Sequence, residues 1–374
     1  MATYTQFFNN DTVNSIDRVF SSAWSGNVND LGASHFSSST QYITTSPTSS
    51  GAFYMEIYDK NPDSDDTAEV QYSIAYGSLT GKGGMDFNDD SGAENISSTK
   101  AIYSQYRNLV FGGDETQNFT FDGYTPDDIY IINVNRARYK NAIRLGNLNI
   151  TLWASQSEQI NIQSPAGALS HLQGAINLTD DSVTTSGSAN AIRAGVGREF
   201  NLVSGSNGIR FGSNNTHVTN SGSYGYVYPD AGFIILNADA LDHSASIAAP
   251  GGIQLNTVDG TLTGSADSAS RAPLKLQNAL IQGGSFILDA SEDISSRYYW
   301  IRVYNQDFNY TTNDSFTAND GTLSFDSMID NPQTYITTVG LYNDNQDLLA
   351  VAKLSQPLPK NFTKEALIKV KLDY

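Results

Sequence analysis

The sequence predicts a mainly β protein with a few short helices, arranged as β-sandwich-like modules with an antiparallel β domain at the C-terminal end. Three observations lead to this prediction. Several short segments alternate apolar and polar residues, which is the pattern of a half-buried strand. Gly, Ser and Asn separate these segments with regular turn chemistry. Tyr (21) and Phe (17) are plentiful, so large side chains are available for a core.

The first predicted element is a short helix near the N-terminus. Asp11 can cap it, and five apolar residues then follow at helical spacing: Val13, Ile16, Val19, Phe20 and Ala23. Residues 53–58 alternate and predict a strand. Residues 69–76 predict another strand, set among acidic loops that contain glycine.

The next elements are a helix and two strands. Residues 98–110 place apolar side chains on one helical face, and the glycine pair 112–113 ends that helix. Residues 129–134 are apolar on both faces, which predicts a central strand. Residues 148–153 alternate, with Leu148, Ile150 and Leu152 facing inward.

From about residue 164 to residue 265 the chain becomes rich in Gly, Ser and Asn. Short apolar runs at residues 199–203 and 224–228 predict strands there. Residues 233–241 begin like a strand and end like a helical turn. Pro273 suits the first position of a further helix, which the glycine pair 283–284 would end.

The C-terminal segment predicts an antiparallel β domain. Residues 298–304 read as a strand, and residues 334–342 and 348–354 flank a polar loop, as in a hairpin. The last residues alternate with a period of two, with four apolar side chains on one face: Ile368, Val370, Leu372 and Tyr374. We therefore expect the C-terminus to be built into a sheet.

These changes of composition predict three domains. The first covers residues 1–163 and is β-rich with short helices. The second covers residues 164–290 and is a β domain rich in Gly, Ser and Asn. The third covers residues 291–374 and is β-sandwich-like.

Composition argues against several classes of protein. The net charge is −18, whereas nonspecific nucleic-acid binding needs a basic face, so we expect no nucleic-acid partner. The chain has no Cys, which removes disulfides, thiol nucleophiles and Cys-based metal sites. No secretory signal and no apolar run of about 20 residues is present, so we expect no membrane partner and a protein assembled in a cytoplasm or released by lysis.

The charge is unevenly distributed. Residues 59–128 hold 14 Asp and Glu against 4 Lys and Arg, and residues 351–374 hold 5 Lys against 2 acids. A chain with this asymmetry can pair head to tail with copies of itself. The densest basic cluster is interpreted as a contact for an acidic neighbour: Arg136, Arg138, Lys140 and Arg144.

The sequence contains no recognisable catalytic residue, metal site or cofactor motif. The four histidines, His35, His171, His217 and His243, show no metal-binding spacing. Residues 86–92 place oxygens as a calcium loop does, but Ser91 stands where the turn Gly belongs and Ser97 where the bidentate Glu belongs. Residues 63–66 depart further from the calcium pattern. Two carboxylates on separate strands leave no local signature, so glycan cleavage stays an open alternative.

Four segments, residues 100–109, 128–140, 337–357 and 362–374, cover 57 of the 374 residues. They resemble virion structural proteins of contractile-tailed bacteriophages, with marine and cyanobacterial phages the most similar. The resemblance implies a virion location and no catalytic residue. It also implies other virion proteins and copies of this chain as partners.

We therefore expect a non-enzymatic structural subunit of a phage virion, most readily in the tail or baseplate, that works as a homo-oligomer through subunit contacts. The expected contacts are the basic cluster and the strand at residues 368–374, whose edge can add a neighbouring strand. The alternatives are a glycan-binding fibre or spike module, a capsid or neck decoration protein, and a glycan-degrading spike enzyme.

Overall fold

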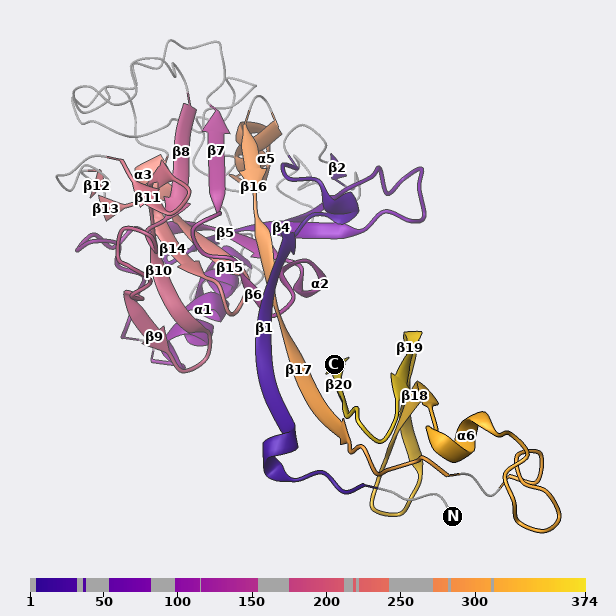
Figure 1. Ribbon diagram of the computed structural model, residues 1–374. Coiled ribbons are helices and arrows are strands. Elements are labelled where there is room, and N and C mark those ends of the chain that lie inside the picture. Colours follow the sequence, from indigo (N-terminus) through magenta and orange to yellow (C-terminus); the bar gives the residue numbers. More distant parts are fainter. Residues whose placement is uncertain are drawn as a thin grey trace. The chain divides into compact units, whose positions relative to one another are not determined.

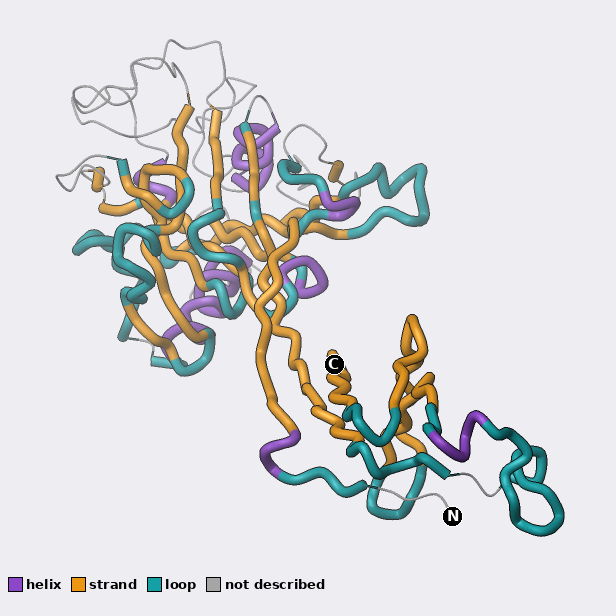
Figure 2. The backbone as a smooth tube through the Cα atoms, in the orientation of Figure 1, coloured by secondary structure: helices purple, strands orange, loops and turns teal. Residues whose placement is uncertain are grey.

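The computed structural model describes residues 5–31, 36–37, 54–81, 98–114, 116–153, 175–211, 218–219, 222–241, 272–281, 284–310 and 313–374. Strands predominate in these residues, and the helices are few (Figure 2). The predicted mainly β fold class is confirmed. The chain divides into two compact units, unit 1 (Met1–Arg18 with Asp293–Tyr374) and unit 2 (Val19–Glu292).

These two units differ from the three predicted domains. Unit 1 contains the predicted C-terminal domain, but it also takes the N-terminal segment, and its boundary falls within strands β1 (Thr12–Ser22) and β17 (Asp289–Val303). Strands from both sides of residue 164 pair in one sheet, because β7 (Asn149–Trp153) lies against β8 (Ala175–Asp180). The predicted boundary at residue 164 therefore does not separate compact units.

Unit 2 is built on a 12-stranded antiparallel sheet (Figure 1). Its strand order is β16 (Ser285–Ile287), β7, β8, β10 (Gly197–Ser206), β14 (Gly225–Tyr228), β15 (Phe233–Asn237), β5 (Asp128–Val134), β4 (Val70–Ser78), β3 (Tyr54–Tyr58) and β2 (Phe36–Ser37). Two short strands, β9 (Ala191–Arg193) and β11 (Ile209–Arg210), also pair with β10.

The centre of this sheet is buried on both faces. In β5, Tyr130 and Ile132 belong to the core on one face, whereas Ile129 and Ile131 belong to the core on the other. The prediction of a central strand at residues 129–134 is therefore confirmed. Alternate side chains of a strand point to opposite faces, so a strand buried on both faces must be apolar throughout.

Helices contribute to the two cores. Helix α1 (Ser98–Phe111) contributes Tyr103 and Val110 to one of them, and helix α5 (Ala272–Ile281) contributes Leu276 and Leu280 to the other. Both helices were predicted. Gly112 ends α1 with a φ of 71°, a left-handed conformation that glycine adopts without steric cost.

The shorter elements of unit 2 connect these parts. The residues after β15 form the predicted helical turn, α3 (Ala238–Leu241). The others are the 3₁₀ turn η2 (Ser25–Asn27), α2 (Arg136–Tyr139), β6 (Ala142–Ile143) and the pair of β12 (Val218–Thr219) with β13 (Gly222–Ser223).

The predicted N-terminal helix is wrong. Asp11 accepts a hydrogen bond from the Phe8 amide at 2.8 Å, but it caps only the 3₁₀ turn η1 (Asn9–Asp11), and the chain then extends into β1. Strand β1 pairs with β17, and β-branched residues such as Val13 and Ile16 suit a strand. Tertiary pairing has overridden the helical spacing of the apolar residues.

Unit 1 packs a hairpin against the ladder of β17 and β20 (Ala366–Asp373) (Figure 1). The hairpin consists of β18 (Thr334–Tyr342) and β19 (Leu348–Lys360), as predicted, and the short helix α6 (Ser327–Asp330) precedes it. Ile368, Val370 and Leu341 form the centre of this core, and Phe7 packs on Tyr299 with their ring centroids 5.2 Å apart.

Candidate functional site

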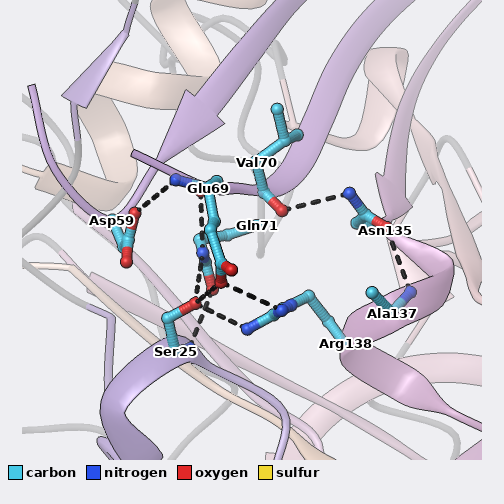
Figure 3. Close-up of polar contacts among 8 residues, drawn as sticks. All are labelled: Ser25, Asp59, Glu69, Val70, Gln71, Asn135, Ala137 and Arg138. Carbon is cyan, nitrogen blue, oxygen red and sulfur yellow. Dashed lines mark hydrogen bonds and ion pairs between the residues drawn. The ribbon is translucent and has the colours of Figure 1, made fainter. Parts of the chain in front are cut away.

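The predicted basic segment lies on α2 and the turn after it. Asn135 precedes the helix, and its side chain accepts a hydrogen bond from the Ala137 amide at 3.0 Å. The same side chain donates to the carbonyl of Val70 at 3.2 Å (Figure 3). These two bonds hold the first turn of α2 beside the start of β4.

Arg138 is the centre of a polar network within unit 2. Its Nη2 lies 3.0 Å from Oε2 of Glu69, and its Nη1 donates to Oγ of Ser25 at 2.5 Å (Figure 3). Gln71 donates to the same Ser25 oxygen at 2.8 Å and accepts from the Ser25 amide at 2.9 Å. Through these contacts Arg138 connects α2 with η2 and with the residue before β4. Its side chain is only 19% exposed, so it offers little surface to a neighbouring molecule.

Two more residues of the basic cluster also have partners inside unit 2. Lys140 pairs with Glu292, and Arg144 Nη1 lies 2.8 Å from Asp289 Oδ2. These partners are about 150 residues away along the chain, so sequence spacing gave no sign of them. The predicted role of Lys140 and Arg144 as subunit contacts therefore competes with ion pairs already made within the unit.

Arg136 differs from the other three basic residues. Its guanidinium lies over the Tyr139 ring, 4.8 Å from the centroid, and the residue is exposed. A stacked, exposed cation keeps most of its hydration. Of the four predicted contacts in this cluster, Arg136 is the one best placed for an external anion.

Charge reversal at Arg138 and at Arg136 should have different effects. We expect Arg138→Glu to lower the free energy of unfolding of unit 2 by about 2 kcal/mol, because it places a carboxylate beside Glu69 and removes the donor to Ser25. Arg136→Glu is the matched control and should change it by less than about 0.5 kcal/mol. Urea unfolding followed by circular dichroism measures both, and equal effects would show that the network is not stabilising.

The other predicted contacts lie on β20. Ile368 and Val370 are buried in the core of unit 1, and Leu372 is half-buried beside them, so these side chains hold the sheet together. Tyr374 is exposed, but its amide donates to the Ser295 carbonyl at 2.9 Å and its carbonyl accepts from the Ser295 amide at 3.2 Å. A neighbouring chain would therefore meet the backbone and the outward side chains of β20.

The outward side chains of β17 and β20 form a ladder of cations and aromatic rings. Trp300 lies opposite Lys369, and Tyr298 lies opposite Lys371. Lys369 Nζ is 4.1 Å from the Tyr298 ring centroid and 5.3 Å from that of Trp300. The alternation at residues 368–374 predicted that the lysines face outward, but only the strand register brings them to the rings.

A second exposed surface covers the outer side of the β18–β19 hairpin. Tyr335, Leu349 and Val351 are 60%, 67% and 60% exposed, and Tyr342 lies on the same side. Several exposed apolar side chains along one hairpin are typical of a surface that another protein covers.

Glu199 on β10 carries a fully buried carboxylate in unit 2. Its carboxylate accepts hydrogen bonds from Arg193, Asn190 and the Tyr228 hydroxyl at 2.8–2.9 Å. Burial, followed by the charge of Glu199, raises the pKa of Tyr228 well above its ordinary value, so Tyr228 remains a donor. Sequence reasoning missed this network, because its only local signal is an acid at the start of an apolar run.

Two adjacent acids lie at the end of β8: Asp180 is its last residue and Asp181 follows it. Asp180 is fully buried and accepts from the amides of Gly146 and Ser182 at 3.0–3.1 Å. Asp181 accepts from the Asn201 amide at 3.1 Å. Burial raises the pKa of both carboxyl groups, and the hydrogen bonds only partly oppose this effect.

The raised pKa of Asp180 gives a testable pH dependence. Because folding favours its protonated form, its stabilising contribution is complete below its ordinary pKa of 3.8 and is lost as pH rises through the folded-state pKa. We therefore expect Asp180→Asn to gain stability relative to the natural chain as pH rises from about 3.8. Urea unfolding of both proteins between pH 3.5 and 7 measures this difference, and a pH-independent difference would contradict it.

Within the described ranges, no group of three or more His, Asp or Glu side chains is arranged to hold a metal ion, and no helix is long and apolar enough to cross a membrane. In the acidic turn at residues 63–66, Asp65 accepts from the amide and hydroxyl of Thr67 at 2.9 and 2.6 Å. The other calcium candidate, residues 86–92, and all four histidines lie outside the described residues.

Comparisons with protein families, with curated proteins and with solved structures found no significant match for this chain. Its function therefore has to be inferred from its own residues and geometry.

Proposed function

We propose that this chain is a structural subunit of a bacteriophage virion, in the tail or baseplate, that acts by making protein contacts. The observation that supports this best is the surface of unit 1. Its hairpin presents Tyr335, Leu349 and Val351 to solvent, and its N-terminal segment presents Phe8 and Ile16, which are 74% and 71% exposed. Side chains of this kind lose solvent contact in subunit interfaces.

The charge distribution supports the same proposal. Unit 2 carries 27 Asp and Glu against 13 Lys and Arg, whereas unit 1 carries 12 against 8. The net charges are therefore −14 and −4 (27 − 13 and 12 − 8). Both units are negative, so a contact made through unit 1, which carries the smaller net charge, meets less electrostatic repulsion than one made through unit 2.

The phage context comes from the resemblance of four segments. Two of them, residues 337–357 and 362–374, coincide with the β18–β19 hairpin and β20, the elements that carry the exposed surfaces of unit 1. The resemblance and the exposed surfaces thus concern the same part of the chain.

The test is the protein content of purified particles. Virions purified from infected cells with and without the gene for this chain should differ in quantitative mass spectrometry. We expect the chain at a fixed copy number per particle, and defective particles without it. A chain found only in the soluble lysate would contradict the proposal.

Glycan binding is the second candidate function, favoured by exposed rings on β17 and directly after it. Trp300 and Tyr304 are both exposed, and aromatic rings of this kind can stack on sugar faces. A glycan array probed with the natural chain and with Trp300→Ala tests it. Binding that the substitution abolishes would favour this function.

A further inference from the structure

Strand β20 forms an open edge of the sheet in unit 1. Among the described residues it pairs with β17 alone. Tyr374 exchanges two backbone hydrogen bonds with Ser295, and bonded pairs alternate in an antiparallel ladder. The even-numbered residues of β20 therefore bond to β17, and the odd-numbered residues direct their N–H and C=O groups outward: Leu367, Lys369, Lys371 and Asp373.

The same four residues carry the side chains of the exposed face. The next strand at this edge would thus meet two lysines on one face and extend the apolar row of Ile368 and Val370 on the other. Lys371 already has carboxylates nearby, Asp373 at 3.1 Å and Asp17 at 3.6 Å. Lys369 has no carboxylate within ion-pair distance among the described residues, so it is the uncompensated charge of the edge.

This charge pattern disfavours pairing of β20 with the β20 of a second copy. In the fully overlapped antiparallel register, Lys369 of each copy would face Lys371 of the other. Like charges directly opposite one another destabilise a strand pair. Lysines on an edge strand are also a common protection against indiscriminate pairing.

We propose that the outer edge of β20 adds an extended segment of a different protein, in which acidic and apolar residues alternate and an acid lies opposite Lys369. This inference rests on the proposed function for the source of the strand, which would be a neighbouring protein of the particle. Main-chain hydrogen bonds to four residues provide the attachment, and the lysine selects an acidic sequence.

The position of the outward amides allows a sharp test. Lys369→Pro removes an outward N–H and leaves the bonds to β17 in place, a substitution that edge strands tolerate. Lys369→Gln keeps the N–H and removes only the charge, so it is the matched control. The probe is a labelled, capped nonapeptide of alternating Val and Glu, and its counterpart has Lys in place of Glu. Fluorescence anisotropy measures binding to the full chain.

We expect the acidic peptide to bind the natural chain saturably and to bind Lys369→Pro about 10-fold or more weakly. Its affinity for Lys369→Gln should fall by a smaller factor. The basic peptide should bind the natural chain only weakly. Equal binding to Lys369→Pro and to the natural chain would overturn the proposal, as would no binding to either. A different outcome is that the chain associates with itself and that Lys369→Pro abolishes that association. The occupant of the edge would then be a second copy, and the proposed choice of partner would be overturned. Because this assay needs no particle, its failure is distinguishable from absence of the chain from virions.

Discussion

Replacing Glu199 with alanine should lower the free energy of unfolding of unit 2 by about 3 kcal/mol. The carboxylate is fully buried, and its removal leaves the Arg193 guanidinium, the Asn190 amide and the Tyr228 hydroxyl without their shared acceptor. The Tyr228 hydroxyl is fully buried, so without Glu199 it loses its acceptor and cannot bond to water, whereas Arg193 and Asn190 can still reach solvent. Urea unfolding followed by circular dichroism measures it.

Glu292→Ala is the matched control for this substitution. Glu292 also pairs with a basic residue, Lys140, but its side chain is 42% exposed. Exposed ion pairs contribute about 0–1 kcal/mol, so the control should be close to the natural chain. If both variants lost the same stability, the buried network of Glu199 would not be a structural centre of unit 2.

Ending the chain after Leu367 should unfold unit 1. The deletion removes Ile368 and Val370 from the core and takes away one of the strand partners of β17. Each large buried aliphatic side chain contributes about 2–5 kcal/mol, and a whole domain is stable by only about 5–15 kcal/mol. Limited proteolysis of the truncated protein should therefore cut rapidly within residues 293–367.

Unit 2 and a surface variant provide the controls for the truncation. Neither core of unit 2 contains a residue of the deleted segment, so a fragment covering unit 2 should persist. Leu367→Ser changes an exposed side chain on the opposite face of β20 and should leave the cleavage pattern unchanged. A truncated chain that resists protease as the natural chain does would contradict the assigned role of β20.

Local sequence patterns predicted the strands best where one burial pattern, one face or both faces buried, holds along the whole strand. The period-two alternation of Ile368, Val370 and Leu372 gave the correct inner face of β20, and the uninterrupted apolar run in β5 gave a strand buried on both faces. The polar loop between β18 and β19 was also correctly placed. In each case the local pattern and the long-range pairing favour the same structure.

Prediction failed where long-range pairing decides the structure. The segment with Val13 and Ile16 has helical spacing, but β17 is its partner and the segment becomes a strand. The basic cluster was interpreted as a contact for an acidic neighbour, which stays a prediction. Its partners, such as Glu69 for Arg138, come from distant parts of the same unit, and only the strand registers bring them together.

These features favour a protein whose buried charges have ion-pair or hydrogen-bond partners within each unit and whose proposed subunit contacts are concentrated on unit 1. An electron cryomicroscopy map of the assembled particle tests this account most directly. We expect density of a neighbouring protein against the hairpin side chains Tyr335, Leu349 and Val351, and a further strand beside Lys369 on β20. A map in which both surfaces face solvent in every copy of the chain would contradict it.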